Sequence, residues 1–186
     1  HAYTYDIKED QTIIPVDLGF IVFNEKTYPN LLNFFKELKV DYEKSNMSLA
    51  VSIKDSKLEY AGKNLGSLFC NKSNLFNIQF IKLIFDIIKF YKLAPNILTK
   101  ENKNLTLGDY LEKNQVSKDL INYHIIPMVA AIWSMPFSKA QDMPLELFVN
   151  FFTNHGLFKL KNRPQWFTVT GRSRKYVSKV LPHISG

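Results

Sequence analysis

Hydrophobic and polar positions alternate in several short segments, as they do in β-strands. Residues 12–24 are instead rich in β-branched and aromatic residues, which also favours a strand, and Pro15 and Gly19 are expected to divide this run into two short pieces. Two of the runs flank the polar residues 54–57, a spacing typical of a hairpin. The predicted strands are residues 3–7, 12–24, 47–53, 58–61, 157–160 and 166–170.

In other segments apolar residues recur every three or four positions, which predicts helices. Pro29 occupies the favoured first position of one helix. A second helix, over residues 77–93, has a polar stripe of Lys82, Asp86 and Lys89 and is apolar elsewhere, so we expect it to be largely buried. Three further helices are expected to begin at Thr106, Ser117 and Pro144.

Two residues predict how these later helices bend and end. Pro127 lies inside the helix that begins at Ser117, where it is expected to kink the helix and free a backbone carbonyl. Gly156 is placed to end the helix that begins at Pro144. The whole pattern predicts an α+β fold in which helices dominate and pack on a small antiparallel or mixed sheet.

The composition indicates a folded chain with a lysine-rich surface. Hydrophobic residues make up 46% of the 186 positions, and no low-complexity run interrupts them. The net charge is +7, but only three of the 24 basic residues are arginine, the residue that nucleic-acid readers favour. We therefore expect a solvated lysine surface and no nucleic-acid partner. The single cysteine, Cys70, excludes an internal disulfide and favours a reducing, cytoplasmic location.

The sequence holds no complete catalytic motif. Its four histidines are far apart without ligands three or four residues away, so no metal site is expected. It has no Gly-x-Ser-x-Gly elbow and no glycine-rich phosphate loop. Tyr123, His124, Met128 and Trp133 could line an apolar pocket, although an ordinary helix core is the alternative interpretation. His155 could contact a substrate or interact with the end of its own helix.

The segment from Val16 to Asn24, followed by Tyr28-Pro29-Asn30-Leu31 and Leu38-Lys39-Val40, resembles the strand, turn and helix that lie beside the flavin in flavin-containing amine oxidases. The similarity extends over nearly the whole chain, to a bacterial branch described as NAD/FAD-binding amine oxidase-like proteins. Further matching segments are residues 47–62, 127–134, 154–157, 163–166 and 166–173. The last of these resembles Trp-x-x-Val-x-Gly-Gly-Ser, except that Arg172 replaces the second glycine, which puts a close backbone approach to a ligand there in doubt.

This resemblance implies FAD as cofactor and a two-domain fold of which the chain is an internal, mainly substrate-side fragment. His1 would end a Gly-Gly-His step, and the nucleotide-binding motif would lie upstream of it. Residues 1–40 would link from the flavin domain, 41–165 would form a helical substrate domain with a hairpin, and 166–186 would return. The cofactor-binding candidates are His1, Asp17, Gly19, Phe20, Ile21, Asn24 and Gly171, and the substrate candidates are Tyr123, Met128, Trp133, His155 and Trp166.

The function implied is that of an FAD-dependent oxidoreductase acting by hydride transfer from an amine or an apolar, lipid-like substrate. A lipid or carotenoid desaturase or isomerase of the same fold is one alternative, and a non-enzymatic helical binding domain is another. The fragment alone is not expected to hold FAD or to be active. It is expected to self-associate, with Phe20, Val22 and Phe23 near the contact, and peripheral membrane contact is left open.

Overall fold

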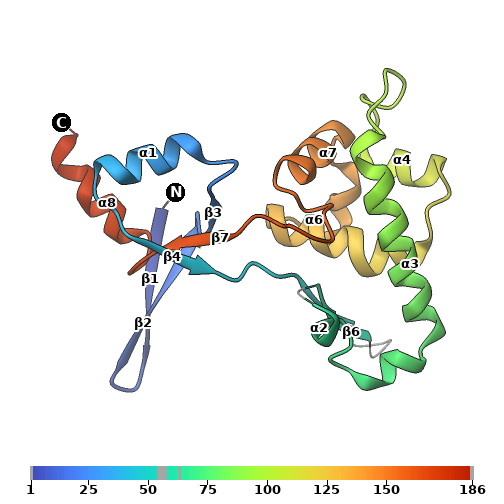
Figure 1. The fold of residues 1–186 in the computed structure, drawn as a ribbon, viewed down its shortest axis with the longest axis horizontal. Coiled ribbons are helices and arrows are strands. Elements are labelled where there is room, and N and C mark those ends of the chain that lie inside the picture. The colour runs from blue at the N-terminus through green and yellow to red at the C-terminus, as the bar shows by residue number, and fades with distance from the viewer. Residues whose placement is uncertain (1, 54–57, 63, 185–186) are drawn as a thin grey trace. The chain divides into compact units, whose positions relative to one another are not determined.

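The computed structural model describes residues 2–53, 58–62 and 64–184 (Figure 1). Contacts divide the chain into two compact units. The first unit joins His1–Met47 to Pro164–Gly186, and the second is Ser48–Arg163. Both termini of the chain therefore belong to one unit, and the second unit is inserted between them.

A two-stranded antiparallel hairpin begins the first unit. Strands β1 (Ala2–Glu9) and β2 (Thr12–Gly19) pair along their full length, with Ala2 opposite Gly19 and Glu9 opposite Thr12. The predicted break at Pro15 is wrong, because each strand of a two-stranded sheet has a free edge where a proline needs no hydrogen-bond partner. The predicted break at Gly19 is confirmed, because β2 ends at this residue, whose φ of 106° is left-handed.

The core of the first unit lies against a three-stranded antiparallel sheet. Strand β7 (Trp166–Val169) is central and pairs with β3 (Phe23–Asn24) and β4 (Tyr42–Ser45). Helix α1 (Pro29–Glu37) begins at the predicted proline, and α8 (Arg174–Val180) with the 3₁₀ turn η5 (Leu181–His183) follows the sheet. The buried apolar side chains that form this core cluster are Phe23, Phe35, Val40 and Val169.

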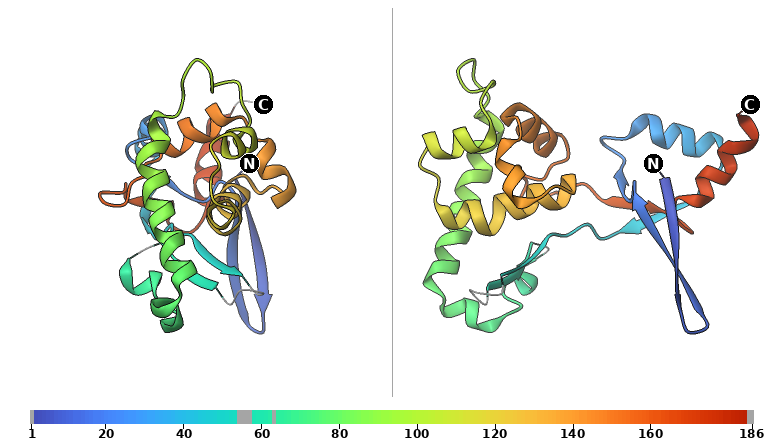
Figure 2. Two further views of the ribbon diagram at one scale, coloured as in Figure 1. Left: turned by 90° about the vertical axis from the view of Figure 1, so that its right-hand side faces the viewer. Right: turned by 180° about the vertical axis from the view of Figure 1, so that it is seen from behind.

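The second unit is mainly helical (Figure 2). Its only described strands are the antiparallel pair β5 (Ala50–Ile53) and β6 (Leu58–Ala61), whose predicted turn at residues 54–57 lies outside the described residues. The helices are α2 (Leu65–Leu68), α3 (Ile78–Leu93), α4 (Leu107–Lys113), α5 (Lys118–Leu120), α6 (Ile126–Trp133) and α7 (Leu145–Asn154). Shorter turns of helix are η1 (Lys72–Phe76), η2 (Ala94–Asn96), η3 (Ile121–Ile125) and η4 (Phe137–Asp142).

Local signals in the sequence set several of these boundaries. Thr106 and Asp109 form a reciprocal capping box at the start of α4. Gly156 adopts a left-handed φ of 66° after α7, as its position predicts. The strand expected at residues 157–160 is absent, because this segment turns and packs Phe158 into the core.

Helix α3 is less buried than the sequence predicts. Phe80, Leu83 and Ile87 are in the core, but Ile78 is 82% exposed and Phe85 is 68% exposed. A helix that is apolar on several faces does not reveal which face meets the core. In the part of the chain that the structure describes, no helix combines the length and apolar character needed to cross a bilayer.

Candidate functional site

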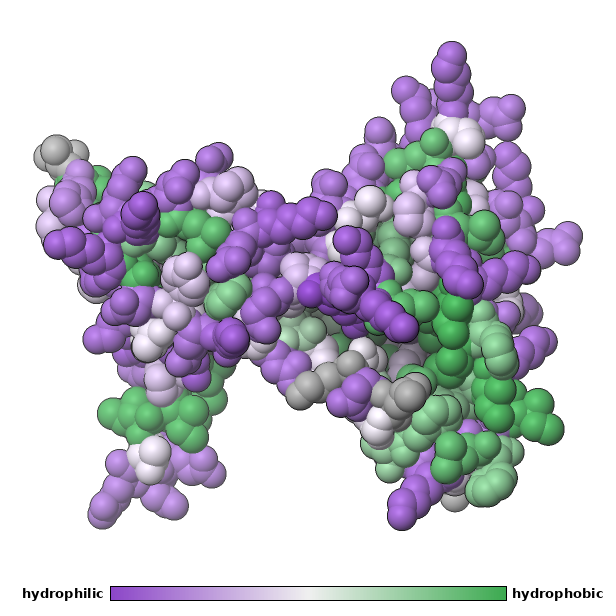
Figure 3. All heavy atoms as spheres, in the orientation of Figure 1, coloured by the Kyte–Doolittle hydropathy of each residue, from purple (hydrophilic) through white to green (hydrophobic). Residues whose placement is uncertain are grey.

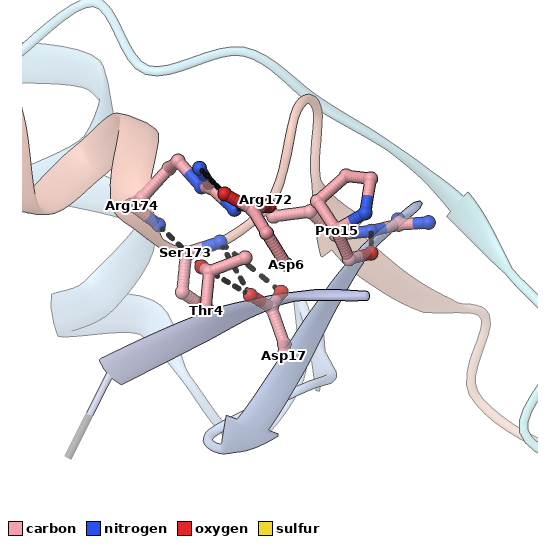
Figure 4. Close-up of polar contacts among 7 residues, drawn as sticks. All are labelled: Thr4, Asp6, Pro15, Asp17, Arg172, Ser173 and Arg174. Carbon is pink, nitrogen blue, oxygen red and sulfur yellow. Dashed lines mark hydrogen bonds and ion pairs between the residues drawn. The ribbon is translucent and has the colours of Figure 1, made fainter. Parts of the chain in front are cut away.

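A buried carboxylate joins the two ends of the first unit (Figure 4). Asp17, on β2, is 8% exposed, and both of its oxygens accept the backbone N–H of Ser173, at 3.0 and 3.1 Å. The Thr4 hydroxyl donates to the same carboxylate at 2.7 Å and accepts the backbone N–H of Arg174 at 3.1 Å. The hairpin therefore supplies the capping acceptors for the start of α8, which has no cap from its own side chains.

Two arginines and a serine strengthen this junction. The Arg172 Nε donates to the Pro15 carbonyl at 3.0 Å, and the Ser173 hydroxyl donates to the Phe20 carbonyl at 3.0 Å. Arg174 forms an exposed ion pair with Asp6, and its hydrogen bond holds the pKa of that carboxyl below its usual value. We name this set the Asp17–Ser173 junction: Thr4, Asp6, Pro15, Asp17, Arg172, Ser173 and Arg174.

The backbone turns sharply on both sides of the junction. Gly19 has a φ of 106° and Gly171 a φ of 76°, values that side chains other than glycine rarely adopt. Arg172 has a φ of 77°, so it holds the left-handed conformation that the glycine of the resembling motif would adopt without strain. The side chain of Arg172 is held in this conformation by its hydrogen bond to the Pro15 carbonyl.

The other cofactor candidates differ in accessibility. Ile21 is 51% exposed, whereas Phe20 is half-buried and stacks against Phe23. Asn24 is fully buried, and its Oδ1 accepts the N–H groups of Lys26 and Thr27, both at 3.0 Å. The Asn24 Nδ2 has no hydrogen-bond partner among the described residues. His1, the remaining cofactor candidate, lies outside the described residues.

The substrate candidates are divided between the two units. Trp166 is buried in β7 of the first unit, opposite Asn24. The other four lie in the second unit. Met128 is buried in its core, and Trp133 packs against Phe151 with ring centroids 4.7 Å apart. Both side chains therefore take part in core packing.

The two other substrate candidates of the second unit are half-buried. Tyr123 lines a shallow recess with Leu58, Asn77, Gln79, Phe80 and Leu83, whose volume of about 10 Å³ has room for about one water molecule. The His155 ring stacks on Phe151, and its Nδ1 lies 2.8 Å from the Phe151 carbonyl at the end of α7. This contact with its own helix is the alternative that the sequence left open for His155.

A buried histidine between two tyrosines is the feature that sequence reasoning missed. His124 is 6% exposed, with its Nδ1 2.9 Å from the Tyr60 hydroxyl and its Nε2 2.7 Å from the Tyr91 hydroxyl. Tyr60 donates to the Tyr123 carbonyl at 2.8 Å. Pro127, four residues later, has no N–H for that carbonyl, so the carbonyl freed by the proline is the one that Tyr60 binds.

This network assigns the histidine tautomer. Because the Tyr60 proton goes to the Tyr123 carbonyl, the Tyr60 oxygen accepts from Nδ1–H, and Nε2 accepts from Tyr91. Burial, and to a smaller extent the charge of Arg163, lowers the pKa of His124 to about 4. Burial raises the pKa values of both tyrosines. The cluster is therefore neutral near pH 7 and satisfied internally, which suits it to structure more than to proton transfer.

Comparisons with known proteins give no further assignment. No protein-family model matches this sequence, and a search of curated proteins finds no significant relative. Within the described ranges, no group of three or more His, Cys, Asp or Glu side chains is placed to hold a metal ion. Of the predicted site residues, the Asp17–Ser173 junction contains Asp17, and its Ser173 hydroxyl donates to the Phe20 carbonyl, while Gly19 and Gly171 are close to it in the sequence.

Proposed function

We propose that this chain is part of an FAD-dependent oxidoreductase that removes a hydride from an amine or an apolar, lipid-like carbon substrate. The Asp17–Ser173 junction carries this proposal. Two segments that resemble flavin-contact segments of amine oxidases, residues 17–24 and 166–173, are far apart in sequence and are hydrogen-bonded together in the first unit. Such convergence is expected of segments that share one ligand.

The residues at the junction suit the ring end of a flavin. Gly19 is exposed beside the exposed side chains of Leu18 and Ile21, which leaves a short stretch of accessible backbone. When bound, the isoalloxazine would accept the hydride, and the protein would supply orientation and electrostatics.

The chain has no group for the pyrophosphate. A dinucleotide phosphate needs a glycine-rich loop before a helix, and none of the 186 positions forms one. In this proposal Asp17 positions the Gly19 turn, and the nucleotide-binding motif belongs to another part of the protein. Of the substrate candidates in the second unit, Tyr123 and His155 keep part of their surface exposed.

Flavin content tests the proposal. The 186-residue chain should purify without colour, whereas the complete protein with its nucleotide-binding part should be yellow and lose that colour when substrate is added anaerobically. In the complete protein, Gly19→Val should lower flavin occupancy, because valine blocks the backbone approach and is strained at this φ. The measurement is flavin absorbance per protein after dialysis.

A second variant separates lost binding from misfolding. Ile21→Glu adds no backbone strain at a half-exposed position, so it should lower flavin occupancy without lowering the melting temperature. Ile13→Glu, at the 60% exposed position on β2, is the matched control and should leave occupancy unchanged. Flavin retained by the isolated chain, or full occupancy and activity in both Gly19→Val and Ile21→Glu, would contradict this placement.

The hairpin is relevant to self-association. A usual surface hairpin packs its apolar face on the protein and exposes its polar face to water, whereas this hairpin does the reverse. Its polar face, with Asp17 and Thr4, packs on the start of α8. Most of the apolar side chains, Ile13 excepted, lie on the other face, and most of these are exposed. They are Tyr3, Tyr5, Ile7, Ile14, Val16 and Leu18, paired across the two strands.

We propose that this apolar face contacts the flavin-binding part of the complete protein and, in its absence, a second copy of the chain. A two-stranded hairpin is marginal without a covered face. Phe23, which we expected near this contact, is fully buried. We therefore propose the apolar face of the hairpin as the contact.

Tyr5→Lys should therefore lower the mass of the isolated chain, measured by light scattering, from at least two chains toward one. Lysine at this 52% exposed position puts charge in the centre of the apolar face. Ile13→Lys, on the opposite face, should leave the mass unchanged. A wild-type monomer at high concentration would refute self-association, and an equal effect of both lysines would refute the choice of face.

A further inference from the structure

Helix α3 and the preceding turn η1 present an apolar surface that the fold does not cover. Phe76 is 89% exposed, Ile78 is 82% exposed and Phe85 is 68% exposed. Figure 3 shows hydrophobic colour over this lower right part of the molecule. The α3 surface comprises Leu75, Phe76, Ile78, Ile81 and Phe85, all of which belong to the second unit.

The spacing explains why these side chains share one direction. Ile78, Ile81 and Phe85 recur at intervals of three and four residues, so they form one outward face of α3. Phe80, Leu83 and Ile87 occupy the opposite face and fill the core. Leu75 and Phe76, in the turn η1 just before α3, are also exposed. The apolar strip is therefore exposed to water and is not buried by helix packing.

The exposed charges on η1 and α3 themselves have one sign. Every charged residue that is exposed on η1 and α3 is a lysine: Lys72, Lys82, Lys89 and Lys92. The one acidic residue of these elements, Asp86, is half-buried and accepts the Ser117 hydroxyl at 2.7 Å. Among the described residues no ion pair neutralises these lysines, because the ion pairs join Lys139 to Asp142 and Arg174 to Asp6.

We propose that the α3 surface docks the protein onto an anionic membrane. Phe76, Ile78 and Phe85 would enter the boundary between headgroups and acyl chains, and the lysines would contact anionic headgroups. Projecting aromatic and aliphatic side chains on one helix face, flanked by lysines, are the features of an interfacial helix.

Two other occupants fit this surface less well. A second copy of the chain would bring two lysine-flanked faces together, and like charges disfavour that contact. A protein partner would normally offer an anchor residue to a pocket, but the recess beside this helix has a volume of only about 10 Å³. A bilayer needs no pocket and supplies both an apolar layer and negative charge.

Vesicle sedimentation tests the proposal. The 186-residue chain should sediment with vesicles of phosphatidylglycerol and phosphatidylcholine, and much less with phosphatidylcholine alone. Raising the salt concentration should weaken the binding, because the lysine contribution is screened. Failure to sediment with the anionic vesicles at low salt would overturn the proposal.

Substitutions locate the contact. The double variant Phe76→Ser/Phe85→Ser should lower the vesicle partition coefficient about tenfold or more, because two large apolar side chains no longer enter the bilayer. Lys82→Gln/Lys89→Gln should lower binding to anionic vesicles and leave the weak binding to neutral ones unchanged. The matched control is Phe137→Ser, a 62% exposed phenylalanine on η4 beside the Lys139–Asp142 pair, which should bind as the wild type does.

Two results would assign the surface differently. If Phe76→Ser/Phe85→Ser sediments with anionic vesicles as the wild type does, the α3 surface is not the contact. If the double variant instead lowers the mass of the chain in lipid-free light scattering, the surface joins copies of the chain and the membrane proposal is wrong. Circular dichroism checks that each variant keeps its helices, which is expected because the substituted side chains are exposed.

Discussion

Lowering the pH from about 6.5 to about 4 should destabilise the second unit by about 3 kcal/mol through His124 alone. In the folded chain, burial lowers the pKa of this histidine from 6.5 to about 4. Between these values the unfolded chain binds a proton that the folded chain does not. The stability that the neutral ring contributes is therefore complete above about pH 6.5, is lost between about pH 6.5 and about 4, and falls no further below the folded pKa.

The hydrogen-bond network explains why the neutral ring is favoured. Nε2 accepts from the Tyr91 hydroxyl, so a proton on Nε2 forces that hydroxyl to turn away. The remaining acceptor within reach is the Met128 sulfur, 3.6 Å from the Tyr91 oxygen, which is a weak one. On protonation of the ring, the Tyr91 hydroxyl would thus donate to the weakly accepting sulfur and no longer to the ring nitrogen. Because the site is buried, solvent does not offset this weaker hydrogen bond.

Urea unfolding at several pH values measures this effect. A Trp166→Phe background leaves Trp133 as the only tryptophan, so its fluorescence reports the second unit. His124→Gln should be less stable at pH 7 but should lose less stability between pH 6.5 and 4 than the parent. His183→Gln, at an exposed position on η5, is the control and should keep the parental slope. Equal slopes in the parent and His124→Gln would contradict the assignment.

Local sequence signals predicted element boundaries well. The proline at position 29, the Thr106–Asp109 spacing and Gly156 act on the backbone of their own segment, so their effects need no knowledge of the rest of the fold. The failures have the opposite origin. Pro15 is tolerated because its strand has a free edge, and residues 157–160 turn because Phe158 packs into the core. Both facts are tertiary.

The candidate site shows the same division. The buried network joins three elements, which contribute Tyr60, Tyr91 and His124 at no regular spacing. Its only local sign in the sequence is Pro127, which leaves the carbonyl four residues earlier without a backbone donor. The link between Asp17 and Ser173 spans nearly the whole chain, and no periodicity predicts it. The family resemblance includes residues at both ends of that link. Matching segments can be recognised one at a time, wherever they lie in the sequence.

Replacing Asp17 tests whether that link holds the first unit together. Asp17→Ala should destabilise the first unit by about 3 kcal/mol, because the Ser173 N–H and the Thr4 hydroxyl lose a charged acceptor in a buried position. Asp17→Asn keeps one acceptor oxygen and should cost about 1 kcal/mol. Asp41→Ala, at an exposed aspartate of the same unit, should change stability little.

The readout separates the two units. In a Trp133→Phe background, the fluorescence of Trp166 on β7 reports the first unit, and its urea midpoint should fall in the order wild type, Asp17→Asn, Asp17→Ala. The midpoint of the second unit should not move. An Asp17→Ala chain with an unchanged Trp166 midpoint would show that the carboxylate does not hold the start of α8. That result would also contradict the proposal that Asp17 positions the Gly19 turn.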